Sequence, residues 1–323
     1  MTVGNLGSIL TSAEGSNWVG SASGVTNDLC AVTYSNGEFV AAGAAGTILT
    51  SANGKTWARA VSGASNNLNG IVQGNGEWAA VGTAGTIVTS VDGSNWVRRL
   101  SGTRSELSAV AYGDGQFVAV GSSGAIVNST DGTNWQASST TNLGLYAVAY
   151  GNGTFVATGE ITNNGPIVLL SSNGMNWMLQ GAPYETMQGI TYASGQFVAV
   201  AVAGQILTSS DGANWIFRHG GYGFADLYSV TYGNSQFVAL GSGGTILESG
   251  SVNLALTLEP DPSSGLLRLS LTGARGLAYT VQSSTDLVSW ASITNFTSAQ
   301  STTVVLDSLA PATRQRFFRA VSH

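Results

Sequence analysis

The chain has 323 residues, of which 44 are glycine and only 9% are charged, against about 25% in an average soluble protein. Its 17 acidic and 11 basic residues give a net charge of −6, which argues against a nucleic-acid partner or an anionic membrane surface. A single cysteine, Cys30, excludes an intrachain disulfide and a cysteine metal cluster. No apolar run approaches the roughly 18 residues of a membrane span, so we expect no transmembrane segment.

One phrase returns six times through residues 1–250: a short apolar strand, a glycine turn and a second strand that begins Phe-Val-Ala or a close variant. It reads Ala31–Tyr34 then Phe39–Ala41, and again Ala109–Tyr112 then Phe117–Ala119. A third element, Gly-x-Ile-Leu or Gly-x-Ile-Val, follows in most copies. A tryptophan marks the fourth element, with spacings of 39, 39, 39, 42 and 38 residues between successive copies at positions 18, 57, 96, 135, 177 and 215.

The joints between these elements carry the residues of tight turns. Asn36-Gly37 and Asp114-Gly115 follow the first strand, while Asp92-Gly93 and Asp211-Gly212 follow the third. Asn-Gly and Asp-Gly accept positive φ at low cost, so neighbouring strands are expected to pair antiparallel. A parallel β-solenoid would need shorter coils and no tight hairpins. A four-stranded meander that repeats about every 40 residues therefore predicts an all-β fold, a β-propeller over residues 1–250.

The number of blades depends on how the two ends of this region meet. The chain begins late in a repeat, at Gly7–Trp18, and the last repeat stops early, at Leu227–Leu247. The simplest closure pairs the strand of Trp18 with the last three strands, which gives six four-stranded blades. One copy of the third element, Ser8–Thr11 or Thr245–Glu248, is then spare. Seven blades are the alternative, with a ring that is left imperfect.

Three of the turns before tryptophan share a longer motif. Ser90–Trp96, Ser129–Trp135 and Ser209–Trp215 resemble the Asp-box of the BNR repeat family, which includes sialidase-type and photosystem assembly-factor-like propellers. The resemblance implies a propeller, and it covers enzymes and binding proteins alike. Glu or Asn replaces the aspartate in other copies, which a side chain that caps its own turn tolerates and a repeated catalytic or metal carboxylate does not. The replaced positions are Glu14, Asn53 and Asn173.

Beyond residue 250 the repeat ends and short strand-like runs alternate with proline and glycine. This rhythm predicts a small immunoglobulin-like β-sandwich over residues 251–323. The phrases Tyr279–Trp290 and Arg316–Ala320 resemble a module that closes many secreted bacterial multidomain proteins.

Binding residues are expected on one face of the propeller, where the loops between second and third strands and between blades differ from copy to copy. Tyrosines there would stack on sugar rings, and Asn, Arg and carboxylate groups would hydrogen-bond hydroxyls. The predicted partner is a glycan or another cell-surface polymer, with a protein as a further possibility. The candidate ligand-binding residues are Arg98, Arg99, Arg104, Glu106, Asn163, Asn164, Tyr184, Arg218, His219 and Tyr222.

An enzymatic alternative is a carbohydrate-active hydrolase or lyase that uses the loop carboxylates Glu160, Glu185 and Asp226. Glycoside hydrolysis needs two carboxyl groups roughly 5–10 Å apart. The sialidase-type resemblance implies an arginine clamp, but adjacent Arg98 and Arg99 would face opposite ways on a strand.

The sequence has too few of the residues that a zinc site or a serine triad requires. The chain has two histidines, so neither a histidine zinc site nor a serine triad is expected, and we predict no metal and no cofactor. Cys30 is interpreted as a small buried apolar residue.

The leading hypothesis is a non-catalytic binding or adhesion protein of bacterial type, located outside the cell or at its surface. Low charge, a single lysine and the carboxy-terminal module support export, and the chain as given shows no signal peptide. A third hypothesis is a structural surface protein that assembles with its own copies. The oligomeric state is left open.

Overall fold

In the computed structural model, the described residues form β-strands and short 3-10 turns, and no α-helix is found among them. The chain divides into two compact units, Met1–Tyr232 with Ala239–Leu247 and Gly233–Val238 with Glu248–His323. The structure describes residues 1–323 except for residues 16, 140–142, 162–164, 182–184, 221–223, 250–254, 261–266, 273–277, 286–288, 298–301, 308–316 and 323.

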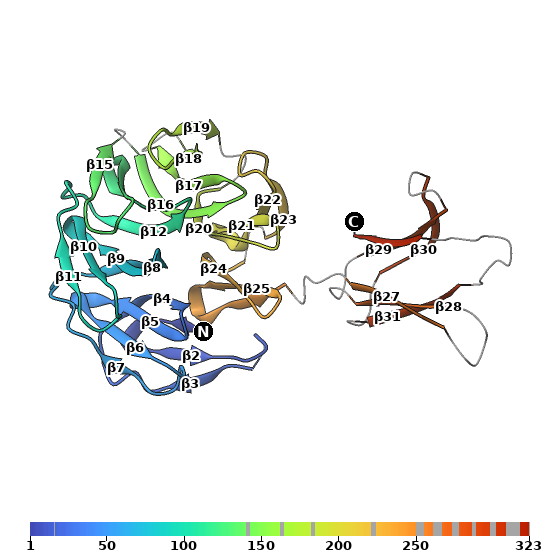
Figure 1. Cartoon of the computed structure of the whole chain (residues 1–323), viewed down its shortest axis with the longest axis horizontal. Helices are drawn as coiled ribbons and strands as arrows, with labels where there is room; N and C mark the ends of the chain where they lie inside the picture. Colours follow the sequence, from blue (N-terminus) through green and yellow to red (C-terminus); the bar gives the residue numbers. More distant parts are fainter. Residues whose placement is uncertain are drawn as a thin grey trace. The chain divides into compact units, whose positions relative to one another are not determined.

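The repeats fold into antiparallel meanders, and five of them are complete four-stranded sheets. Figure 1 shows the sheets from β1 to β23 following one another around a common centre. Sheet 2 contains β4 (Leu29–Ser35), β5 (Glu38–Gly43), β6 (Ile48–Ser51) and β7 (Ala58–Arg59). Sheet 3 contains β8 (Leu68–Gly74), β9 (Glu77–Gly82), β10 (Thr86–Ser90) and β11 (Val97–Arg99). Sheet 4 contains β12 (Leu107–Gly113), β13 (Gln116–Gly121), β14 (Ala125–Ser129) and β15 (Gln136–Ser139). Sheet 5 contains β16 (Leu143–Gly151), β17 (Thr154–Ile161), β18 (Gly165–Ser171) and β19 (Met178–Gly181). Sheet 6 contains β20 (Met187–Ala193), β21 (Gln196–Ala201), β22 (Ile206–Ser209) and β23 (Ile216–His219).

The two terminal meanders are three-stranded sheets of their own. Sheet 1 contains β1 (Thr2–Val3), β2 (Ile9–Thr11) and β3 (Val19–Ser21), and sheet 7 contains β24 (Leu227–Gly233), β25 (Gln236–Gly241) and β26 (Ile246–Glu248). This differs from the closure that we expected, in which the strand after Trp18 pairs with the last three strands. The reason is that neither copy of the third element is spare: β2 takes β3 as its partner, and β26 pairs in sheet 7.

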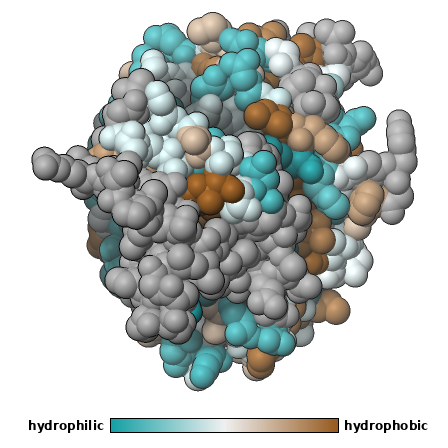
Figure 2. All heavy atoms as spheres, turned by 90° about the vertical axis from the view of Figure 1, so that its right-hand side faces the viewer, coloured by the Kyte–Doolittle hydropathy of each residue, from teal (hydrophilic) through white to brown (hydrophobic). Residues whose placement is uncertain are grey.

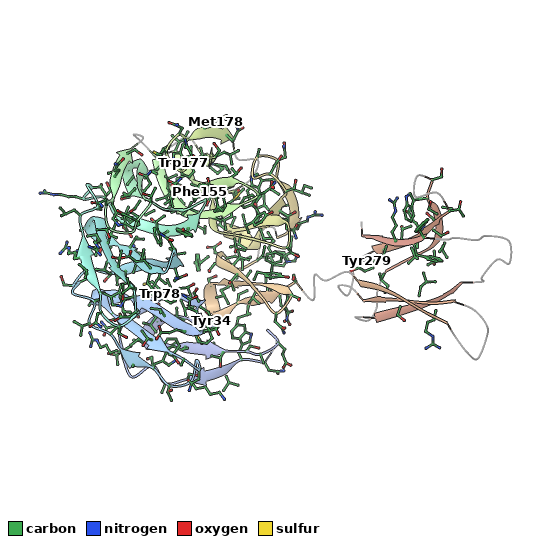
Figure 3. The ribbon with its side chains drawn as sticks, viewed as in Figure 1. Tyr34, Trp78, Phe155, Trp177, Met178 and Tyr279 are labelled. Carbon is green, nitrogen blue, oxygen red and sulfur yellow. The ribbon has the colours of Figure 1, made fainter. Side chains whose placement is uncertain are left out.

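The core of the first unit lies between consecutive sheets. Phe117 is fully buried and packs with Ile87 of the preceding sheet and with Trp135 of its own. Phe155 repeats this arrangement in sheet 5, where its ring centroid lies 6.5 Å from that of Trp177 (Figure 3). Tyr112 on the first strand of sheet 4 joins the cluster of Phe117, since their ring centroids lie 4.7 Å apart. The recurring aromatic residues are therefore packing residues, as the repeat predicted.

The tight turns have the backbone that their sequences predicted. Asn36 and Asp114 have φ of 52° and 46°, and a glycine with positive φ follows each. In the turn before Trp96, Oδ1 of Asp92 accepts the N–H groups of Ser94 at 2.9 Å and Asn95 at 2.8 Å. These bonds hold the pKa of the Asp92 carboxyl well below its usual range. The repeated carboxylate therefore caps its own turn. An amide does the same at the equivalent position of another sheet, where Oδ1 of Asn53 accepts the N–H groups of Lys55 and Thr56.

The second unit contains two three-stranded antiparallel sheets. One has the order β27 (Ala255–Pro260), β28 (Leu267–Thr272), β31 (Thr302–Asp307), and the other β30 (Ala291–Thr297), β29 (Ala278–Ser284), β32 (Phe317–Ser322). Leu269, Leu271, Tyr279 and Val281 are buried. Packing of the two sheets as an immunoglobulin-like sandwich stays a prediction.

Candidate functional site

Three of the arginines that we expected in the loops between blades lie on the outermost strands. Arg98 and Arg99 belong to β11, and Arg218 belongs to β23. Nε of Arg99 donates to Oγ1 of Thr89 at 2.8 Å, and its guanidinium lies 3.6 Å from Glu77. Arg218 makes the same bond to Thr208, also at 2.8 Å. Two outer strands thus use arginine in the same way, which indicates a structural role at the edge of the sheets.

The other described candidates on these connections are exposed. His219 ends β23, and its ring meets that of Phe224 edge to face at 5.0 Å. Arg104 and Glu106 lie in the connection from β11 to β12. Asn163, Asn164, Tyr184 and Tyr222 lie outside the described residues.

Asp226, one of the three carboxylates expected in an enzyme, caps a turn. Its Oδ1 accepts the N–H of Ala203 at 2.8 Å, and Ala203 has φ of 53°. Asp28 does the same for Leu6 at 2.8 Å, and an asparagine, Asn67, does it for Ala45 at 3.0 Å. Since an amide replaces the carboxylate at one of these positions, the role does not require an acid.

Glu160 on β17 takes part in a small hydrogen-bonded group with Tyr146 on β16 and with Thr186, which directly precedes β20. Thr186 Oγ1 donates to Glu160 Oε2 at 3.4 Å. Partial burial, together with a hydrogen bond to Glu160 and its charge, raises the pKa of Tyr146 to about 12. Glu185 is exposed beside Thr186. The structure brings Glu160 together with a tyrosine and a threonine.

A feature that sequence reasoning missed lies near the start of the first strand of each meander from β4 onward. We call these first strands the inner strands, because Figure 1 shows them nearest the common centre. The pairing of the first two strands shifts by one residue at the same place in sheets 2 to 6, so each inner strand carries a β-bulge. Bulges leave a residue unpaired and redirect its side chain. The bulge residues are Cys30, Asn69, Ser108, Tyr146 and Gln188, and Tyr228 occupies the same place in β24. We call these six residues the bulge ring.

The residue type differs among the positions of the bulge ring, whereas the positions directly before and after each of them carry similar residues in every copy. A large apolar residue precedes each bulge residue and a small residue follows it, as in Leu68-Asn69-Gly70. This contrast is visible in the sequence once the copies are aligned.

Cys30 corrects an expectation, because it is exposed and not buried. It occupies the bulge of β4, the strand that follows the three-stranded sheet 1. Partial desolvation and the nearby charge of Asp28 raise the pKa of its thiol. The thiol is thus protonated at neutral pH, which suits a contact residue better than a nucleophile.

The bulge ring lies at an acidic end of the inner strands. Asn69 Nδ2 donates to Glu106 Oε1 at 2.9 Å and to the carbonyl of Leu107 at 3.0 Å. The sequence places one lysine or arginine, Arg104, in the sheet-to-sheet connections at this end. Carboxylates outnumber it: Asp28, Glu106, Glu160, Glu185 and Asp226.

Among the residues drawn in colour in Figure 2, no single broad apolar patch marks an alternative site. There the described apolar residues lie as separate spots among hydrophilic ones. Among the residues that the structure describes, no three His, Cys, Asp or Glu side chains group as metal ligands would.

Comparisons with known proteins identify the fold but not a family. No protein family and no curated protein matches the sequence. A structure of YCF48 bound to D1 peptide is similar with a TM-score of 0.61 and 19% identity, over 76% of this chain and 87% of that chain. YCF48 from Cyanidioschyzon merolae gives 0.57 and 18%, over 76% and 89%. A streptogramin B lyase structure gives 0.57 and 12%, over 75% and 90%. YCF48 and the lyase are both β-propellers, so about three quarters of this chain has the propeller fold.

Proposed function

We propose that the protein is a non-catalytic binding protein that holds an extended polypeptide segment against the bulge ring. The observation that carries the proposal is the β-bulge at one register position of five inner strands, with a different side chain at each. A rigid scaffold that presents varied side chains at equivalent points is a common design for recognition.

The carboxylates argue for binding over catalysis. Asp226 is engaged as a turn cap, and Glu160 accepts a bond from Thr186. Tyr146, whose pKa is raised to about 12, stays protonated at neutral pH and is a poor general base.

The side chains of the ring fit a polypeptide. Asn69 and Gln188 carry amides, which match the donors and acceptors of a main chain, and the tyrosines add flat apolar surface. The surrounding excess of carboxylates favours a segment that carries lysine or arginine. The similar YCF48 structure is described as bound to a peptide, which supports a polypeptide partner.

The location of the protein is part of the proposal. Low charge content and a single lysine support an extracellular or cell-surface location, as in secreted proteins with BNR-type repeats and a closing sandwich. The described residues include no helix of the length and apolar character that a membrane span requires.

The test is a selection of random dodecapeptides displayed on phage, with counter-selection on the Asn69→Ala/Gln188→Ala variant. Selected peptides are expected to be rich in basic residues and to bind the variant at least tenfold more weakly. Raised ionic strength is expected to weaken the binding of these peptides to the wild type, because salt screens the attraction between their basic residues and the carboxylates. Gln136→Ala, which removes an exposed amide from outer strand β15, is the control and should bind as the wild type does.

Two outcomes contradict the proposal. Peptides that bind the double variant as well as the wild type would exclude the bulge ring. Binding on a glycan array that the double variant loses, with no peptide selected, would replace the polypeptide by a glycan.

A further inference from the structure

Sheet 5 continues past the point at which the other complete sheets end. In sheets 2, 3, 4 and 6 the second strand is followed at once by a 3-10 turn, as β5 is by Ala44–Gly46. In sheet 5 the strand itself runs on. Glu160 of β17 pairs with Gly144 of β16 on one side and with Pro166 of β18 on the other. The backbone of Glu160 is therefore fixed by strands on both sides.

Two hydroxyl groups orient the carboxylate of Glu160. Thr186 Oγ1 donates to its Oε2 at 3.4 Å, and Tyr146 forms a hydrogen bond with it. Two residues earlier on β17, and so on the same face, Thr158 donates to the carbonyl of Met187 at 3.0 Å and joins sheet 5 to sheet 6. The partners of the carboxylate are neutral, and no lysine or arginine among the described residues forms an ion pair with it.

A notch lies beside this carboxylate because the residue paired with it is a glycine. A Cβ on Gly144 would lie 3.4 Å from Oη of Tyr146 and 3.9 Å from Cγ of Glu160. These are ordinary van der Waals distances, so the place of a side chain is free. At Gly159, one residue earlier on β17, a Cβ would lie 2.1 Å from the carbonyl oxygen of Gly144, so that position is closed. We call the space between Gly144, Tyr146 and Glu160 the sheet 5 notch.

The sheet 5 notch adjoins the bulge ring, because Tyr146 belongs to both. Its three residues are partly exposed, so solvent reaches it. Strand β16 contacts β12 and β20, which carry the ring residues Ser108 and Gln188. A segment that lies along the ring would therefore pass the notch.

We propose that the sheet 5 notch binds the guanidinium group of an arginine in the segment that the bulge ring holds, an inference that rests on the function proposed above. An ionised carboxylate offers about four lone-pair sites, and the two hydroxyl donors use only part of them. The planar fork of a guanidinium matches the sites that remain and can stack on the ring of Tyr146. A lysine ammonium is a compact, strongly hydrated charge without such a plane.

The other carboxylates at this end have different surroundings. Asp28 and Asp226 accept main-chain N–H groups of turns. Glu106 accepts a side-chain amide and is exposed, and Glu185 is exposed as well. These four groups add to the general attraction of positive charge. Glu160, which two hydroxyls hold beside an open space, is the residue that selects arginine.

The experiment starts from random dodecapeptides displayed on phage and selected on the full chain. The selected peptide that binds most tightly is synthesised with each arginine in turn replaced by citrulline, which keeps the shape and loses the charge. Fluorescence anisotropy then measures binding. One such replacement is expected to weaken binding to the wild type at least tenfold. The Glu160→Gln variant should bind the parent peptide and that citrulline peptide equally, as in a double-mutant cycle.

Matched variants control for charge and for size. Glu185→Gln removes the same charge from an exposed position nearby and should keep the preference for arginine over citrulline. Gly144→Val fills the notch and should lose that preference. Gly181→Val on outer strand β19, where a Cβ would meet nothing within 4 Å, should keep it. If Gly144→Val does not fold, Glu160→Gln decides the test, because its amide oxygen still accepts from Thr186.

Three results would overturn the inference. These are selected peptides without arginine, a citrulline effect that Glu160→Gln leaves unchanged, and an arginine that lysine replaces without loss. Each can occur while Asn69→Ala/Gln188→Ala still weakens binding, and the function proposed for the bulge ring then stands without the notch. Peptides that require Glu160 but bind the double variant normally would instead contradict the bulge ring. A selection that yields no peptide contradicts both.

Discussion

Sheets 1 and 2 carry the same sequence formula but have different surroundings. Gly4 has φ −169° and ψ −160°, and Gly43 has φ −170° and ψ −156°. A 3-10 turn follows each, and its central residue, Leu6 or Ala45, has φ near 54°. Yet Gly43 is enclosed by an inner strand and Gly4 is not. The local sequence therefore determines the backbone conformation, whereas a neighbouring strand determines whether a side chain larger than glycine fits at the position.

The largest effect is expected from the pair Gly43→Val and Gly4→Val. Valine at 43 would place its Cβ 2.1 Å from a main-chain oxygen, so the sheet must open. We expect a loss of unfolding free energy of about 3 kcal/mol or more, against about 0.5 kcal/mol or less at position 4. Urea unfolding of the two variants measures the difference. Equal losses would show that the position in sheet 1 is filled.

A second pair concerns the contact between inner strands. Gly113 lies against the ring of Tyr150, whereas sheets 2 and 3 use Ser35 and Gln73, with the serine hydroxyl 3.1 Å from the amide oxygen. Gln73→Tyr alone should cost about 1–3 kcal/mol through overpacking. Adding Ser35→Gly should recover most of that loss in a double-mutant cycle. Additive losses would mean that the two positions are not coupled.

The repeat allowed most of the fold to be predicted, because turns and strands depend on nearby residues. Asn36-Gly37 and the fully buried Phe117 behave as their patterns indicated. The closure was not predictable on this basis. Ile9–Thr11 and Ile246–Glu248 both match the third strand, and the sequence does not state whether two such strands share a sheet.

The site was predicted less well, for two physical reasons. Arg99 and Arg218 are unusual side chains in a low-charge chain, but each bonds a threonine on its own sheet. The bulge ring depends on the register between paired strands, and no residue type specifies that register. In the sequence, the bulge ring is indicated only where the repeats are aligned, because a variable position such as Asn69 then lies between two positions that are similar in every copy.

A smaller effect distinguishes the tryptophans of sheets 2 and 4. The indole N–H of Trp135 donates to the carbonyl of Gly132 at 2.8 Å, while that of Trp57 is buried without a partner. Trp135→Phe leaves the carbonyl without its donor, so it should cost about 1 kcal/mol more than Trp57→Phe. Thermal unfolding in parallel measures this. A greater loss at 57 would indicate that its indole has a partner.

The smallest effect is expected in acid, from replacing Asp92, Asp131 and Asp211 together with asparagine. Each carboxyl has a pKa below its usual range, with main-chain and side-chain N–H donors as the largest cause. A depressed pKa in the folded state gives stability that is present above the unfolded pKa of about 4 and is lost as pH falls below it. The triple variant should therefore lose less stability than the wild type between pH 4 and 2, in urea titrations at each pH. Asn53 and Asn173 show that the amide still caps the turn. Parallel acid profiles for the two proteins would mean that the carboxylates bond their turns no better when charged than an amide does.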